Sequence, residues 1–500
     1  MTHTPPTDVD VLVIGAGISG ISAAGHLRAR RPGTTFAVLE AREEIGGTWS
    51  LFRYPGIRSD SDMTTFGFGF RPWRHRKSIA DGHLILDYLR QTVAERRLGE
   101  HIHVGHRVLS ADFSTADGRW TVTAEQSGSG RTVRFTARFL FVGTGPYDHD
   151  EGYTPDFAGV EDFTGRVVHP QHWPEDLDHT GRQVVVIGSG ATAVTLVPAM
   201  ARTAGHVTML QRSPGYVFSA PAEDAIANTL RTLLGPRRAH RIVRRKNVLL
   251  TRAVYKASRR APKLMRRLLI AGVRRRLPRH YDVDTHFTPR YAPWDQRLCL
   301  VPNGDLFKAI SSGRASVVTD RIERFTGTGI LLESGQELAA DVVVTATGLR
   351  MAVFGKVRLS VDEQPVHVPD TTAYKAMMLS GVPNFVFALG YTNLSWTLKV
   401  DLVGEHFCRL LDHMDAHGYR TVEPVLDDPY LERLPYMDLT SGYVRRGIGT
   451  FPRRGTSGPW TVEMAYEKDV ERLRRGPVAD SALRFTTGPA RAASPSGQAR

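Results

Sequence analysis

The sequence predicts an α/β fold with two Rossmann-like domains, each suited to bind a dinucleotide, and a helical insertion in the second domain. Three observations predict this fold. A strand, glycine turn and helix pattern occurs near the start of the chain, and it recurs about 170 residues later. The chain has 500 residues, which is too long for a single hydrophobic core.

The first unit consists of an apolar strand at residues 10–14, the turn GAGISG and an Ala-rich helix at 18–30. In such a turn Gly15 permits the tight bend, Gly17 lets the backbone approach a pyrophosphate, and Gly20 allows close packing of helix on strand. The helix N-terminus then offers unpaired N–H groups to the diphosphate. This pattern predicts a first dinucleotide site.

The strand that follows, residues 35–39, ends at Glu40. An acidic residue at this position accepts hydrogen bonds from an adenosine ribose. With strand, helix and acidic terminus all present, an ordinary glycine turn explains the pattern less well than a nucleotide site.

The second unit has a strand at 183–187, a glycine turn that opens a helix, and a strand at 206–210. The residues of its phosphate cradle are Gly188, Ser189, Gly190, Ala191, Thr192 and Ala193. Gln211, Arg212 and Ser213 follow the second strand where a carboxylate would otherwise stand. Because a guanidinium binds a 2′-phosphate and a carboxylate repels it, NADPH is favoured over NADH. Arg212 as a plain surface cation is the alternative.

Paired small-residue turns at 143–145 and 346–348 follow two more apolar strands, and we expect the chain to cross between domains there. The first nucleotide domain is then formed by residues 1–150 and 345–485, and the second by 151–344. A basic helical insertion occupies about 220–290, and residues 486–500, rich in Ala, Ser, Pro and Gly, are expected to be a disordered tail.

The net charge of +14 is concentrated in one segment, because residues 231–280 hold 18 Lys and Arg and no Asp or Glu. The rest of the chain therefore carries 14 − 18 = −4. A helical pattern in this segment indicates either a solvated helix face or a surface that touches anionic lipid or a partner. No nucleic-acid module accompanies the charge, so nucleic-acid binding is not expected.

Several patterns that are absent from the sequence exclude other classes of protein. Cys299 and Cys408 lie far apart, which argues against dithiol disulfide reductases, and no cluster at metal-ligand spacing is found, so no metal is expected. The sequence has no signal pattern and no apolar stretch of about 18 residues, so a cytoplasmic protein is expected. It predicts no oligomeric state.

A longer motif between the two cradles is more specific. FTGRVVHPQHWP, at residues 163–174, resembles the fingerprint of Baeyer–Villiger monooxygenases, F-x-G-x-x-x-H-x-x-x-[WF]-[PD]. GGTW at 46–49, RYPGIRSD at 53–60 and YAPWDQR at 291–297 also resemble that family, and the likeness extends from about residue 8 to 480. The resemblance implies that FAD binds the first cradle and NADPH the second.

The resemblance also implies roles for single residues. Arg297 matches the active-site arginine that stabilises negative charge on the reacting oxygen, and Asp60 matches the carboxylate that holds it. A structural role for Arg297 and a helix-capping role for Asp60 are the alternatives. Ten residues are expected to line the cofactors: Ser19, Gly47, Thr48, Trp49, Leu51, Arg58, Ser59, Asp60, Val108 and Trp396. Trp49 and Trp396 could equally be core residues.

Within the fingerprint, Phe163, Gly165, His169 and Trp173 are expected to act at the hinge between domains. The function implied is insertion of one oxygen atom from O2 into ketones, giving esters or lactones, with oxygenation of soft sulfur in thioamides or thioethers. Nitrogen and sulfur oxygenation without carbonyl activity is one alternative. A membrane-surface or partner-binding protein on a nucleotide-binding scaffold is the other.

Overall fold

The computed structural model describes residues 7–488, and its larger sheet has nine strands in the order β20-β19-β4-β5-β6-β1-β2-β3, with β23 beside the end of β6. The strands β1, β2, β3, β6 and β23 are parallel, whereas β5 is antiparallel to both β4 and β6. Their bounds are β1 Asp8–Ile14, β2 Phe36–Leu39, β3 Ile102–His103, β4 His106–Ser114, β5 Arg119–Gln126, β6 Thr132–Val142, β19 Arg358–Val361, β20 Gln364–Pro365 and β23 Phe385–Phe387. The central strands are apolar and buried, as expected for a sheet covered on both faces.

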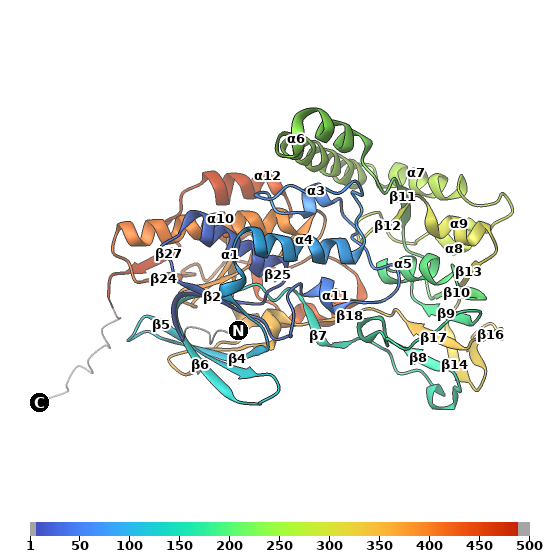
Figure 1. The fold of residues 1–500 in the computed structure, drawn as a ribbon, viewed down its shortest axis with the longest axis horizontal. Helices are drawn as coiled ribbons and strands as arrows, with labels where there is room; N and C mark the ends of the chain where they lie inside the picture. Colours follow the sequence, from blue (N-terminus) through green and yellow to red (C-terminus); the bar gives the residue numbers. More distant parts are fainter. Residues whose placement is uncertain (1–6, 489–500) are drawn as a thin grey trace, which may run out of the picture.

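Two helices pack side by side against this sheet. They are α1 (Ile18–Arg30) and α10 (Trp396–Ala416), which come from opposite ends of the chain. Accordingly, Figure 1 shows blue and orange segments together in one half of the molecule. Their buried faces share one hydrophobic core that includes Leu27 and Phe407.

The smaller sheet has five parallel strands in the order β13-β10-β9-β17-β8. These are β8 Arg166–Val168, β9 Gln183–Ile187, β10 His206–Gln211, β13 Ala315–Thr319 and β17 Val342–Thr345. The helices α5 (Ala191–Met200) and α9 (Asp305–Ser311) share their own core with this sheet. The predicted α/β fold with two Rossmann-like units is confirmed.

The two halves are joined by strands that lie next to each other. β7 (Tyr147–Gly152) pairs in antiparallel fashion with β18 (Leu349–Met351), and each begins shortly after one of the predicted small-residue turns. At the C-terminal end, Thr486 is the last residue of β27 (Leu483–Thr486), which pairs with β24 (Thr421–Pro424). Residues 489–500 of the expected tail lie outside the described residues.

The basic segment forms α6 (Ala225–Arg260) and α7 (Pro262–Arg274), which confirms the helical insertion. The pattern is not one continuous helix, because Gly235 has φ 73° and ψ 164° and bends α6 just before Pro236. Pro262 starts a new helix because proline suits the first helical position, where no N–H is needed. α6 lies at the edge of the molecule, over the short helix α3 (Met63–Phe66) (Figure 1).

Candidate active site

The first glycine turn has the geometry that the sequence predicts. Gly15 has φ +95°, a conformation that residues with a side chain rarely adopt, and it follows directly on β1. A Cβ on Gly20 would lie 1.8 Å from the carbonyl oxygen of Gly15, so only glycine lets α1 pack this closely. Gly17 starts α1 without any side-chain cap and faces Gly47, which leaves the helix N-terminus open to an anion.

Glu40 lies at the end of β2, beside this turn. Its Oε2 accepts a 2.7 Å hydrogen bond from the Ala16 amide, and its Oε1 accepts one of 3.0 Å from the Arg42 amide. Burial raises the pKa of Glu40, although the amide hydrogen bonds oppose that shift. The carboxylate is therefore held in one position and retains lone pairs for a ribose.

The turn opens into a cleft between segments from both ends of the chain. Eleven of the predicted site residues line it, from both ends of the chain: Gly15, Gly17, Ser19, Glu40, Gly47, Thr48, Trp49, Asp60, Val108, Arg297 and Trp396. Trp396, the first residue of α10, donates a 3.0 Å hydrogen bond from Nε1 to Ser19 Oγ. Trp49 packs against Phe66, which also lines the cleft. Both tryptophans therefore line the cleft and also pack against the hydrophobic core.

Arg297 and Asp60 meet in this cleft, with Nη2 of the arginine 3.2 Å from Oδ2 of the aspartate. Arg297 precedes β12 (Cys299–Pro302) in the inserted half, whereas Asp60 belongs to the N-terminal part of the chain. The Asp60 carboxylate raises the pKa of the Arg297 guanidinium above its ordinary value, and burial opposes this shift. The side chains are 39% and 36% exposed, so Asp60 holds the guanidinium of Arg297 in place where a ligand in the cleft can reach it.

The alternative that Asp60 caps a helix is excluded by its neighbour Asp62. Asp62 is the N-cap of α3, and its Oδ1 accepts hydrogen bonds from the amides of Thr64 and Thr65. The cap position is therefore taken, and the Asp60 carboxylate is left for Arg297.

The second glycine turn follows β9. Gly188 has φ +142°, and a Cβ there would lie 2.4 Å from the carbonyl oxygen of Ala346. Ala193 is buried within α5, so alanine fits where the third glycine of the pattern stands. Ala191 and Thr192 form the first turn of α5 after its N-cap, Gly190.

Arg212 and Ser213 lie beside this turn, since Ser189 Oγ donates a 3.0 Å hydrogen bond to the Ser213 carbonyl. Arg212 is exposed, and within residues 7–488 it forms no ion pair. Gln211 is buried and donates to the carbonyl of His286, so it faces away from the turn. Arg212 is therefore available to a phosphate near the turn.

Apart from the residues of the second cradle, four residues predicted to bind a cofactor do not line the cleft. Arg58 forms an ion pair with Asp305 of α9, and Ser59 Oγ accepts a 3.0 Å hydrogen bond from the Ala80 amide. Leu51 ends the short helix α2 (Thr48–Leu51). Gly20 is also outside the cleft lining, in keeping with its packing role.

The segment that contains Arg58 instead joins the two halves. A Cβ on Gly56 would lie 2.7 Å from Cβ of Ala199 in α5, and the Tyr54 ring packs into the core of the smaller sheet. Burial raises the pKa of Tyr54 to about 12, and Thr192 of the second cradle partly opposes that shift. This segment therefore holds the second cradle in place relative to the first.

The fingerprint residues lie at the junction of the halves. Phe163 is buried against Phe325, Trp173 packs against the core of the smaller sheet, and Gly165 leaves room for the Asp341 carbonyl. The His169 ring lies where a Cβ of Gly152 would be, at the end of β7, and its Nε2 is 3.3 Å from the Gly348 carbonyl, just before β18. Its Nδ1 accepts from the Gln171 amide, so Nε2 carries the proton and donates. His169 thus contacts both connecting strands.

Comparison with known proteins agrees with this geometry. A family model described as flavin-binding monooxygenase-like matches residues 9–361. The FAD-containing monooxygenase EthA of Mycobacterium tuberculosis is 53% identical over 483 residues, covering 96% of this chain and 98% of that protein. The chain belongs to the flavin-binding monooxygenase-like family.

Further relatives of this flavin-binding monooxygenase-like protein agree with the assignment. The probable FAD-binding monooxygenase AlmA of Acinetobacter baylyi is 47% identical, covering 95% of this chain and 96% of that protein. Among solved structures, oxidized steroid monooxygenase bound to NADP has a TM-score of 0.75 at 22% identity, covering 96% of this chain and 100% of that one. OTEMO in complex with FAD and NADP has a TM-score of 0.74 at 20% identity, covering 97% and 100%. At these identities the structures show a shared fold.

Several residues that line the cleft belong to no motif that the sequence analysis identified. Tyr147 lines the cleft near Arg297, and its ring lies 6.2 Å from that of Tyr443. Burial raises the pKa of both phenols, so they stay neutral donors beside the arginine. Arg42 also lines the cleft, and only its position two residues after Glu40 could have indicated this from the sequence.

Proposed function

We propose that this protein is an FAD- and NADPH-dependent Baeyer–Villiger monooxygenase that converts ketones to esters or lactones and also oxygenates soft sulfur. The observation that carries this proposal is the Arg297–Asp60 pair, which places a permanent cation in the cleft that starts at the first glycine turn. The family and the FAD-containing relatives support a flavoprotein monooxygenase of this kind.

The cleft residues suit FAD. Gly17 and Gly47 approach each other so closely that a Cβ on Gly47 would lie 3.1 Å from Cα of Gly17, which leaves backbone rather than side chains at the phosphate position. Glu40 would hold the ribose, and Trp49 and Trp396 offer flat apolar surfaces. When bound, the flavin supplies the oxygen chemistry and NADPH supplies the hydride.

Arg297 would stabilise the negative charge that develops on the carbonyl oxygen of a ketone. A guanidinium keeps its charge at every working pH, and Asp60 fixes its position before substrate arrives. Sulfur oxygenation develops less negative charge on the substrate, so it depends less on this cation. The two activities should therefore respond differently to loss of Arg297.

The proposed NADPH site is the second cradle, with Arg212 for the 2′-phosphate. We also propose that residues 1–150 and 345–485 form the FAD domain and residues 151–344 the NADPH domain, with Phe163, Gly165, His169 and Trp173 at the hinge. The pairing of β7 with β18 and the contact of His169 with both connections support this division.

The test is NADPH consumption by the FAD-loaded protein with a panel of ketones and thioethers, with products identified by mass. We expect esters or lactones from wild type, and a loss of about 100-fold or more in Arg297→Ala. Arg290→Ala, seven residues away and exposed without an ion pair within the described chain, is the matched control. Sulfoxides alone from wild type, or NADPH oxidation without oxygenated product, would contradict the carbonyl activity.

A further inference from the structure

The exposed apolar side chains of this protein are concentrated on α6 and α7. Nine of the twelve exposed large hydrophobic residues within 7–488 belong to these two helices. Six of them, which we call the outer apolar stripe, are Leu233, Ile242, Leu249, Leu250, Leu264 and Leu268. Since single exposed leucines are ordinary but a concentration is not, this stripe requires a partner.

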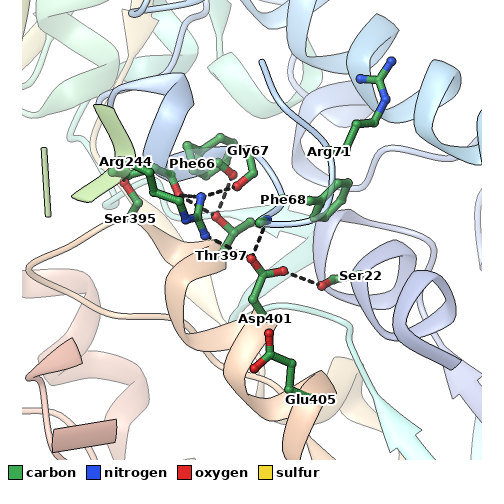
Figure 2. Close-up of polar contacts among 12 residues, drawn as sticks. Ser22, Phe66, Gly67, Phe68, Arg71, Arg244, Ser395, Thr397, Asp401 and Glu405 are labelled. Carbon is green, nitrogen blue, oxygen red and sulfur yellow. Dashed lines mark hydrogen bonds and ion pairs between the residues drawn. The ribbon is translucent and has the colours of Figure 1, made fainter. Parts of the chain in front are cut away.

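The cations of α6 and α7 differ in whether they are bonded to the rest of the protein. The inward cations of α6 are bonded: Arg244 donates to the carbonyls of Thr64, Thr65 and Gly67 and to Asp401, and Lys246 pairs with Asp224. Figure 2 shows Arg244 reaching Asp401 and the loop after α3. These bonds fix the rotation of α6, so its opposite face is presented outward.

Four other cations of α6 and α7 are paired, Arg252 and Lys256 with Glu467, Arg259 with Asp295 and Arg274 with Asp284. Further outward cations form no ion pair within the described residues. They include Arg238, Arg245, Lys263 and Arg267, all exposed. Arg238, Ile242, Arg245 and Leu249 are spaced by four, three and four residues, so they share one helix face. Neither α6 nor α7 contains an acidic residue.

We propose that the outer faces of α6 and α7 bind the surface of an anionic lipid bilayer. Leucines between unpaired arginines are what an interfacial helix needs, because apolar side chains enter the headgroup boundary while cations meet lipid phosphates. A second copy of this chain fits poorly, since it would bring arginine against arginine. Nucleic acid fits less well than lipid because the exposed apolar side chains of these helices are aliphatic, and Tyr255 packs edge to face against Trp294.

In the part of the chain that the structure describes, no helix has the length and apolar character needed to cross a bilayer.

The test is co-sedimentation of the full-length, FAD-loaded protein with phosphatidylcholine vesicles, with and without phosphatidylglycerol. We expect binding only with the anionic lipid, and loss of that binding when salt is raised from about 0.05 M to about 0.5 M. The double variant Arg238→Gln/Arg245→Gln should bind about 25-fold more weakly, at about fivefold for each charge. Arg134→Gln/Arg358→Gln removes two exposed, unpaired charges from strands β6 and β19 and should bind as wild type does.

The apolar contribution is tested with Leu249→Gln/Leu264→Gln, which should weaken binding by at least tenfold, against Tyr430→Gln, an exposed aromatic outside the two helices. Absence of binding to anionic vesicles at low salt would overturn the proposal, as would equal weakening by the control variants. Light scattering tests whether a second copy of this chain covers the stripe instead. A wild-type dimer that does not bind vesicles, and that Leu249→Gln/Leu264→Gln converts to a monomer, would identify an interface between two copies. If a variant folds poorly, the salt dependence of wild-type binding to anionic vesicles still tests the proposal.

Discussion

Arg244 of α6 and the buried Asp401 of α10 form an ion pair, with Nη2 3.0 Å from Oδ2, that ties the basic insertion to the core of the larger sheet. The other oxygen of Asp401 accepts a 3.1 Å hydrogen bond from Ser22 Oγ in α1 (Figure 2). The Gly69 amide donates a further hydrogen bond to Asp401. Three segments that are distant in sequence therefore converge on one carboxylate.

Removing one member of this pair leaves the other charge in the protein interior without its oppositely charged partner, with only its hydrogen bonds to compensate. We expect Arg244→Met or Asp401→Asn to lower the free energy of unfolding by about 3 kcal/mol. Because the partners are coupled, the double variant should cost less than the sum of the single changes. Chemical denaturation measures all three. Glu151→Gln, which removes one member of the exposed pair with Arg350, should cost under about 1 kcal/mol, and a similar small loss for Arg244→Met would contradict this prediction.

Gly20→Ala tests the packing of the first turn. The new Cβ would lie 1.8 Å from the Gly15 carbonyl oxygen, so α1 must move away from β1 and from the cleft. We expect a loss of about 2 kcal/mol in unfolding free energy and a purified protein with little bound flavin, measured by visible absorbance. Gly33→Ala is the control, since a Cβ there meets nothing within 4 Å. Full flavin content in Gly20→Ala would contradict the packing argument.

The nucleotide-binding units were the most predictable part of the fold. The predicted helix at 18–30 and strand at 183–187 coincide with α1 and β9, because an apolar strand, a glycine turn and a helix are all specified locally. The break of α6 at Gly235 was not predicted, although the dipeptide Gly235-Pro236 is a local signal for such a break. Periodicity reports which face is apolar, whereas one backbone conformation decides where a helix bends.

The candidate site was predictable only in part. Asp60 and Arg297 lie 237 residues apart, so their contact follows from the family resemblance and not from local patterns. Arg58 matches the same motif, but its role depends on Asp305, which lies 247 residues further along the chain. Contacts between the halves are set by how the two sheets pack, which the sequence does not display.

Arg212→Ala tests the choice of nicotinamide cofactor. If Arg212 binds the 2′-phosphate, its loss removes a charge-assisted contact, and KM for NADPH should rise about 10- to 100-fold. KM for NADH should change little, because NADH has no such phosphate. Steady-state kinetics with both cofactors gives the ratio, and Arg182→Ala, an exposed arginine just before β9, is the control. Equal changes for both cofactors would point to a general loss of binding.

Asp60→Asn tests the positioning of the active-site arginine. The amide keeps the size of the side chain but loses the charge that holds Arg297, so we expect kcat for ester formation to fall about 10- to 100-fold. Sulfoxide formation should fall less, and Asp60→Glu should restore part of the ester activity. Unchanged ester formation in Asp60→Asn would show that Arg297 needs no carboxylate partner.

His169 makes the stability of the junction depend on pH. Burial lowers the pKa of His169, and the nearby His172 contributes in the same direction. In the unfolded chain this histidine takes up a proton near pH 6.5. Between the folded pKa and that value, the unfolded state binds more protons, so the free energy of unfolding rises with pH across this window.

Protonation of His169 would also break the hydrogen bond from the Gln171 amide to Nδ1. We therefore expect wild type to lose stability as the pH falls through about 6.5 toward the lower pKa of the folded state, with a slope from this group of at most about 1.4 kcal/mol per pH unit. His169→Gln should show a shallower slope in denaturation measured across that range. His83→Gln, an exposed histidine of α4 (Gly82–Glu95), is the matched control, and if both variants keep the wild-type slope then His169 does not set it.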